Sequence, residues 1–298
     1  MARSMNILVI GNPIAGTGQT DRRIKLFVRA LEQHGHDVQV LMSKRSGEAL
    51  ELAGAIDGDI NRLVVAGGDG TVNEVINGLI DPSRIPILHL PTGTANQLAR
   101  SLDLPFDPYK LADILEHGSI RRIDMGLVEN HRFLLLVSSG FDARVAREVK
   151  KSRNDTLGYA GYLVPILRAC ASHRAHQLRV IIDNEQTISG CNVMVLKVRE
   201  YGGFFVFAQE ARLDSGYFEV CVFQQGSIPW MSLYAFAGLV GKAAELPGVI
   251  RVKARMVRIE SEDPIPVEID GDHFGMTPVD IQIQPSVVPV IVPNHARQ

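Results

Sequence analysis

One glycine-rich loop has the composition of a phosphate-binding turn. Gly67-Gly68-Asp69-Gly70-Thr71 directly follows the apolar run Leu63–Ala66 and precedes a segment with helical periodicity. Glycines let backbone N–H groups approach an anion, and the N-terminus of a helix favours negative charge. An acidic residue in such a loop suits a metal ion or a metal-bound water, so Asp69 is a candidate magnesium ligand. Glu74 lies in the first helical turn and is a candidate for the same site. The alternative is a tight turn in which Asp69 caps the helix.

Two further loops lie between an apolar strand and a helix. Pro91-Thr92-Gly93-Thr94-Ala95-Asn96 offers hydroxyl and amide groups beside an accessible glycine backbone, and Asn12-Pro13-Ile14-Ala15-Gly16 follows the first apolar segment. The spacing from Gly11 to Gly16 is that of a P-loop, but Thr17 stands where the P-loop lysine belongs, which excludes that class of nucleotidase. Each loop alone is equally well explained as a capped turn. Because open parallel sheets bind ligands at the carboxyl ends of their strands, the three loops together predict a nucleotide site.

The elements that must position these loops alternate between strands and helices. Short apolar runs are separated by segments whose apolar residues recur at helical spacing, which predicts a parallel sheet covered on both faces. These runs are residues 7–10, 38–42, 63–66 and 87–90. After residue 125 short strands and turns follow one another, a pattern typical of an antiparallel sandwich or barrel, with helical stretches expected at 142–151 and 159–171. We therefore expect an α/β nucleotide-binding domain at 1–125, completed by the tail 280–298, and a β-rich domain at 126–279.

Composition and charge exclude several classes of protein. The chain has 298 residues, 46% hydrophobic and 21% charged, which excludes a disordered or fibrous protein. Thirty-one basic residues against 33 acidic ones give a net charge of −2, so no nucleic-acid partner is expected. The three cysteines have no paired spacing and indicate reduced thiols. The apolar runs are too short for a bilayer span or a signal-peptide core, so we expect a cytoplasmic protein.

The order of several motifs along the chain resembles the catalytic region of the diacylglycerol kinase family. Besides the three loops, the landmarks are Asp124-Met125-Gly126, Gly140-Phe141-Asp142-Ala143, Leu213-Asp214-Ser215-Gly216 and Ile269-Asp270-Gly271-Asp272. The resemblance implies a kinase that uses ATP and Mg²⁺ to phosphorylate a lipid hydroxyl, such as that of diacylglycerol. It also implies the fold shared with NAD kinases, in which a nucleotide-binding α/β domain is joined to a β-rich domain for the lipid substrate.

The same resemblance implies roles for individual carboxylates. Asp270 corresponds to the general base that accepts the proton of the lipid hydroxyl, and Asp272 is expected to assist it. Asp69 and Asp124 would organise the catalytic Mg²⁺ around the triphosphate. A carboxylate suits the role of base because phosphoryl transfer needs positioning and charge neutralisation more than covalent help. Without the resemblance, Asp270-Gly271-Asp272 is interpreted as a hairpin turn and Asp124 as a turn residue at a strand end.

Three positions depart from the family's pattern. Gln97 follows Asn96 where the lipid kinases commonly have Asp, and Asp272 replaces the usual Glu. Ser215 replaces the second Asp of the usual Asp-Asp-Gly turn, which in the bacterial lipid kinases helps to hold a structural metal. The candidate ligands of a weak structural metal site are therefore Leu213, Asp214 and Ser215. An NAD kinase-like enzyme and a non-catalytic relative that senses nucleotide or lipid stay open as alternatives to the lipid kinase.

A basic segment predicts contact with a membrane surface. From Arg144 to Arg179 there are eight Lys or Arg residues against two acidic ones, with aromatic and aliphatic residues interleaved. We expect a peripheral contact with anionic lipid headgroups near the entrance for a lipid substrate. The alternative is a solvated helix face beside ordinary core. A homodimer is one alternative for the assembly.

Overall fold

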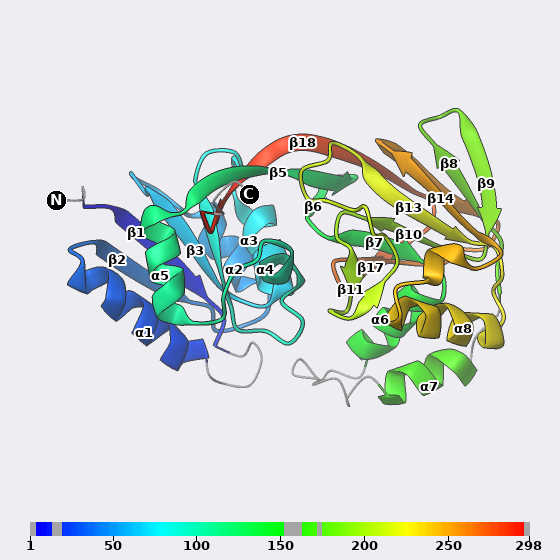
Figure 1. The fold of residues 1–298 in the computed structure, drawn as a ribbon, viewed down its shortest axis with the longest axis horizontal. Coiled ribbons are helices and arrows are strands. Elements are labelled where there is room, and N and C mark those ends of the chain that lie inside the picture. The colour runs from blue at the N-terminus through cyan, green and yellow to red at the C-terminus, as the bar shows by residue number, and fades with distance from the viewer. Residues whose placement is uncertain (1–3, 14–19, 152–162, 172–174, 295–298) are drawn as a thin grey trace. The chain divides into compact units, whose positions relative to one another are not determined.

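The chain folds into two compact units, which are described separately. The computed structural model describes residues 4–13, 20–151, 163–171 and 175–294. Unit 1 comprises Met1–Ile123 and Ser286–Gln298, and unit 2 comprises Asp124–Pro285 (Figure 1). The chain passes between the units within two strands, β5 (Ser119–Val128) and β18 (Val279–Val292). The returning tail therefore enters unit 1 at Ser286, six residues later than the expected 280.

Unit 1 is built around a parallel sheet. Its strands are β1 (Asn6–Gly11), β2 (Asp37–Met42), β3 (Arg62–Gly67) and β4 (Ile87–Pro91). They lie in the order β2-β1-β3-β4, and the end of β18 adds a further parallel strand beside β4. The inner strands β1, β3 and β4 are nearly continuous runs of buried apolar residues, whereas the edge strand β2 is partly exposed. Strands covered on both faces need apolar side chains at successive positions, so this arrangement explains the continuous runs in the sequence.

Helices cover both faces of this sheet (Figure 1). They are α1 (Thr20–Gln33), α2 (Glu48–Gly54), α3 (Asp69–Gly78), α4 (Gln97–Ser101) and α5 (Pro108–His117). The helix α1 packs against α5, and α2 packs against α3. The α2–α3 contact needs a glycine, because a Cβ on Gly78 would lie 2.1 Å from the carbonyl oxygen of Leu50. The predicted α/β fold with a parallel sheet is confirmed for this unit.

Unit 2 is an antiparallel sandwich. One sheet has the order β14-β13-β10-β7-β16-β17, with every neighbouring pair antiparallel. Its strands are β7 (Leu136–Ser139), β10 (Asn192–Leu196), β13 (Phe218–Phe223), β14 (Val249–Ala254), β16 (Pro266–Ile269) and β17 (Asp272–Met276). The facing layer contains β8 (Leu178–Ile182), β9 (Gln186–Gly190), β15 (Met256–Ser261) and the first part of β18, with the short β6 (His131–Phe133) paired to β5. Buried valines and isoleucines from both layers form one core, so the predicted antiparallel sandwich is confirmed.

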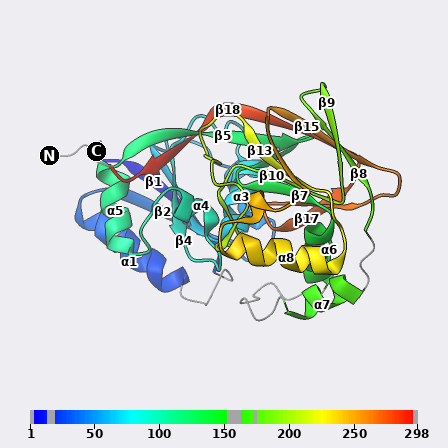
Figure 2. The ribbon, with the colours of Figure 1, turned by 45° about the vertical axis from the view of Figure 1, so that its right-hand side comes forward.

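The outer face of the six-stranded sheet is covered by helices (Figures 1 and 2). The helix α6 (Phe141–Lys151) packs on β7, β16 and β17, and α7 (Leu163–Ala171) packs on α6. The helix α8 (Ile228–Leu239) contributes Tyr234 and Ala237 to a second core, near the short strands β11 (Glu200–Tyr201) and β12 (Phe205–Val206). The sequence analysis missed α8, because its apolar residues surround the helix and form no stripe. None of the helices in the described part of the chain has the length and apolarity to cross a bilayer.

Candidate active site

Two of the three glycine-rich loops touch through their backbones in unit 1. Gly68 follows β3 and Gly93 follows β4, and these strands are parallel neighbours. A Cβ on Gly93 would lie 2.4 Å from the Cα of Gly68, and a Cβ on Gly68 would lie 3.2 Å from the Cα of Gly93. A side chain at Gly93 would overlap the facing backbone and one at Gly68 would crowd it, so with glycine at both positions the backbones themselves form the surface at this point. The helix α3 starts here with Gly68 as its N-cap and no side-chain cap, which leaves the positive end of the helix for an anion.

Asp69 joins the two loops through hydrogen bonds to the backbone. Its Oδ2 accepts the N–H of Gln97 at 2.9 Å, and its Oδ1 accepts the N–H of Leu98 at 3.0 Å. The carboxylate therefore caps α4, the helix after the other loop, instead of its own helix α3. A side chain at position 97 is not needed for this contact, because the bond uses the backbone of Gln97. Each oxygen has a second lone pair, so a role of Asp69 toward Mg²⁺ stays a prediction.

The second loop is held by its own asparagine. Asn96 has a left-handed backbone conformation, with φ of 48°, which directs its side chain back over the loop. Its Oδ1 accepts the N–H of Gly93 at 2.9 Å, and its Nδ2 donates to the carbonyl of Gly93 at 2.8 Å. Thr92 is buried and Thr94 is exposed. Asn96 thus positions Gly93 against Gly68, which gives it a structural role within the predicted site.

The carbonyl of Gly67 is fixed by two donors from β4 and the loop after it. The backbone N–H of Thr92 donates to it at 2.9 Å, and Nε2 of the buried His89 lies 3.0 Å away. Burial lowers the pKa of His89, so the neutral ring with its proton on Nε2 is the form that donates. The sequence analysis missed His89, whose only signal is a polar residue inside an otherwise apolar strand.

The remaining candidate residues of unit 1 differ in where they lie. Asn12 lies at the site, because its Nδ2 donates to Oγ1 of Thr71 at 3.4 Å, and Pro13 follows it at the end of β1. Gly70 lies in the first turn of α3. Glu74 is directed elsewhere, since its Oε1 accepts the N–H of Gly47 before α2 at 3.0 Å. Gly16 lies outside the described residues.

In unit 2, Asp270 occupies a tight hairpin turn. Asp270 and Gly271 join β16 to β17 and have φ values of 48° and 96°, as a two-residue hairpin loop requires. The carboxylate of Asp270 accepts the backbone N–H groups of Leu134 at 3.0 Å and of Leu135 and Leu136 at 2.9 Å. These bonds fix the orientation of the carboxylate. Asp272 is exposed at the start of β17, and its expected role of assisting Asp270 stays a prediction.

A pair of carboxylates that the sequence analysis missed, one fully buried and one half-buried, lies behind this turn. Glu268 is fully buried, and its Oε1 accepts the N–H of Gly271 at 2.9 Å. The hydroxyl of Ser138 lies 2.5 Å from Oε2 of Glu268 and 2.8 Å from Oδ2 of Asp142, and the hydroxyl of Tyr201 donates to Asp142 at 2.5 Å. One serine proton cannot serve two anions, so one carboxyl group must be protonated. Burial and the neighbouring Asp142 raise the pKa of Glu268 well above its usual range, which assigns the shared proton to Glu268.

The wild-type protein should lose stability as pH rises, and we expect Glu268→Gln to lose less. A carboxyl group whose pKa is raised by folding keeps its proton in the native state while the unfolded chain ionises, so stability falls above the unfolded pKa of about 4.5. Thermal melts from pH 4.5 to 8 should show a melting temperature that falls with pH more steeply for the wild type than for the variant. Asp272→Asn, which changes an exposed carboxylate, is the control. Parallel curves for wild type and Glu268→Gln would contradict the shared proton.

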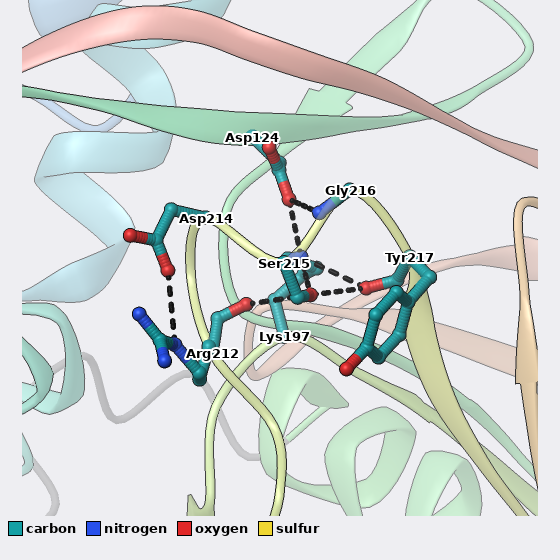
Figure 3. A network of polar contacts seen from close by, with 7 residues as sticks. All are labelled: Asp124, Lys197, Arg212, Asp214, Ser215, Gly216 and Tyr217. Atoms are coloured by element: carbon teal, nitrogen blue, oxygen red, sulfur yellow. Dashed lines mark hydrogen bonds and ion pairs between the residues drawn. The ribbon is translucent and has the colours of Figure 1, made fainter.

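Asp124 does not fit the predicted role of magnesium ligand. Its carboxylate is fully buried and forms an ion pair with Nζ of Lys197 at 2.6 Å, and it also accepts the N–H of Gly216 at 2.7 Å (Figure 3). A fully buried carboxylate already paired with an ammonium group is not accessible to a nucleotide-bound metal. In the described part of the chain there is no group of three or more His, Cys, Asp or Glu side chains that could hold a metal ion.

Comparison with known proteins agrees with this organisation. The family model of the diacylglycerol kinase catalytic domain matches residues 6–128, and that of the YegS C-terminal NAD kinase beta sandwich-like domain matches residues 135–292. The chain belongs to the diacylglycerol kinase family. Membership of this family makes it an enzyme of the lipid kinase class.

The sequences of known relatives align with nearly the whole length of this chain. It is 27% identical to the diacylglycerol kinase of Staphylococcus carnosus, covering 97% of this chain and 95% of the relative. It is 26% identical to that of Staphylococcus aureus strain RF122, covering 96% and 92% of the two chains. A crystal structure of a diacylglycerol kinase from Bacillus anthracis has a TM-score of 0.76 at 22% identity and covers 99% of both chains, which supports the fold.

Proposed function

We propose that this kinase transfers the γ-phosphate of ATP, bound with Mg²⁺, to the hydroxyl of a diacylglycerol-like lipid. The observation that carries the proposal is the contact between Gly68 and Gly93 beside the uncapped N-terminus of α3. Bare backbone at a helix N-terminus is a site for phosphate groups. Unit 1 is thereby the nucleotide-binding domain, and Mg²⁺ enters with the nucleotide, with Asp69 as its candidate protein ligand.

Unit 2 supplies the proposed general base for the lipid that accepts the phosphate. Asp270 is the general base that takes the proton of the lipid hydroxyl, because backbone N–H groups fix the carboxylate of this half-buried residue beside the exposed Gly271. The names of the relatives with 26–27% identity support diacylglycerol as the lipid class. The oxygen of the hydroxyl bonds to the γ-phosphorus, the bond from this phosphorus to ADP breaks, and Asp270 accepts the released proton.

A transfer assay tests the acceptor directly. γ-³²P-labelled ATP with Mg²⁺ is incubated with diacylglycerol, monoacylglycerol, phosphatidylglycerol, a sphingoid base and a polyprenol, each in mixed micelles, and with NAD in solution. We expect label to move to diacylglycerol in preference to the other acceptors. Transfer to NAD alone would replace the proposal with an NAD kinase. A protein that binds ATP but labels no acceptor would be the non-catalytic relative.

The proposed membrane contact combines basic and apolar groups of unit 2. Lys151 on α6 and Arg168 on α7 are exposed. On the neighbouring α8, Phe236 is 65% and Leu239 52% exposed, although both are large apolar side chains. These helices cover the same face of the six-stranded sheet (Figure 2). The other basic residues of the predicted segment that fall in 152–162 and 172–174 lie outside the described residues.

We expect Lys151→Glu/Arg168→Glu to weaken sedimentation with phosphatidylglycerol vesicles. Each basic residue near an anionic surface contributes about 1 kcal/mol, so reversal of two charges should reduce binding by more than about tenfold at low salt and by less at high salt. Phe236→Ser/Leu239→Ser should reduce binding at every salt concentration, because the apolar term is not screened. Lys25→Glu, at a 74% exposed lysine of unit 1, is the control. Equal binding to neutral vesicles, independent of salt, would contradict the contact.

A further inference from the structure

The fully buried side chain of Lys197 ends in a cage of three oxygen atoms. Lys197 directly follows β10, and its Nζ lies 2.6 Å from Oδ2 of Asp124, 2.9 Å from Oγ of Ser215 and 2.9 Å from the carbonyl oxygen of Tyr217 (Figure 3). Both charged side chains are fully buried. An ammonium group has three N–H donors, and each has one acceptor here. The cage therefore satisfies a monovalent cation completely.

The groups expected to hold a structural metal are engaged in other contacts. The carbonyl of Leu213 accepts the backbone N–H of Asp124 at 2.7 Å. The carboxylate of Asp214 is paired with Arg212 at 3.2 Å. Ser215 accepts from Lys197 and presents its own hydroxyl proton to the carbonyls of Arg212 and Tyr217, at 3.1 and 2.9 Å. The three residues therefore do not fit a divalent metal, and the position between this turn and Asp124 is already filled by a cation.

The charges account for the substitution. The charge of Asp214 is already paired with that of Arg212, so an aspartate at position 215 would add a second uncompensated carboxylate beside Asp124, and two such charges match a divalent ion. With Ser215, Asp124 is the carboxylate that Lys197 contacts, and the single positive charge of Lys197 neutralises it. A buried charge needs a compensating partner with good hydrogen-bond geometry. The uncharged serine therefore matches the single charge of the lysine.

We propose that Lys197 is a built-in cation that replaces a structural divalent metal in unit 2. Its ammonium group holds Asp124, at the end of the chain's passage from unit 1, to the turn at 212–217. This part of the kinase therefore folds without a bound metal, and the enzyme uses Mg²⁺ only with its nucleotide.

The first experiment uses the nucleotide-free wild-type protein. After dialysis against EDTA, its melting temperature should change by less than about 2 °C when Mg²⁺, Ca²⁺ or Mn²⁺ is added. Lys197→Met should lower the melting temperature on the order of 10 °C, because it leaves the negative charge of Asp124 buried without a compensating cation. The control is Lys25→Met, since Lys25 is 74% exposed and pairs with the exposed Asp21 at 2.6 Å, and a surface pair of this kind contributes little.

The second experiment restores the site for a metal. Lys197→Ala/Ser215→Asp removes the ammonium group and adds a carboxylate, so its melting temperature should rise on the order of 5 °C with Ca²⁺ or Mg²⁺ and fall with EDTA. A folded double variant that ignores divalent ions would overturn the proposal, as would an unchanged stability of Lys197→Met. If the double variant does not fold, the response of the wild-type melting temperature to EDTA tests the proposal. A wild-type response to EDTA that Asp124→Asn abolishes would show a metal at this position and overturn the proposal.

Discussion

Asp270→Asn is expected to lower kcat by at least about 10²-fold while the affinity for ATP stays unchanged. The amide has the shape of the carboxylate but cannot accept the proton of the lipid hydroxyl. The change also has a structural cost, because the amide can direct only one oxygen toward the three N–H groups of Leu134, Leu135 and Leu136. Steady-state kinetics, ATP binding and the melting temperature must therefore be measured on the same preparation.

A matched control separates the two effects. Asp183 also lies in a hairpin turn with a positive φ, 49°, and its Oδ1 accepts the N–H groups of Arg255 and Met256 at 2.8 and 2.7 Å. Asp183→Asn makes the same chemical change in another hairpin turn, and Asp183 has no proposed role in the reaction. We expect both variants to lose some stability and only Asp270→Asn to lose turnover. Near-normal kcat in folded Asp270→Asn would show that the base is another group.

Gly93→Ala is expected to weaken the binding of MgATP by more than about tenfold, which corresponds to roughly 1.4 kcal/mol. The new methyl group would lie 2.4 Å from the Cα of Gly68, so one of the two loops must move away from the proposed phosphate site. Gly68→Val should have a similar effect, because its Cβ already lies 3.2 Å from Gly93 and its two methyl groups extend beyond it. Isothermal titration with MgATP measures both affinities.

Gly275→Ala is the control for the glycine variants, since a Cβ at this position meets no atom within 4 Å. It should bind MgATP as the wild type does. The melting temperatures show whether the variants of Gly68 and Gly93 are folded. An unchanged MgATP affinity in a folded Gly93→Ala protein would contradict the nucleotide site at these loops, whatever lipid the enzyme uses.

The sequence alone was sufficient for the fold class and for the location of the glycine loops. The inner strands of unit 1 are buried on both faces, so they must be continuous apolar runs, and such runs are visible without a structure. Gly68 and Gly93 follow two such strands, and parallel neighbours place the residues at their carboxyl ends together. The turn at Asp270 and Gly271 was also predictable, because turn positions with φ above zero favour Asp and Gly.

Only the tertiary structure decided what the charged residues do. Asp69 and Glu74 lie five positions apart, yet one holds α4 and the other the chain before α2. Glu268 meets Ser138 across 130 positions, and Lys197 meets Asp124 across 73. Apolar burial follows local patterns that repeat along a strand or helix. A charged side chain is placed by the groups that compensate it, and folding brings those groups from distant parts of the chain.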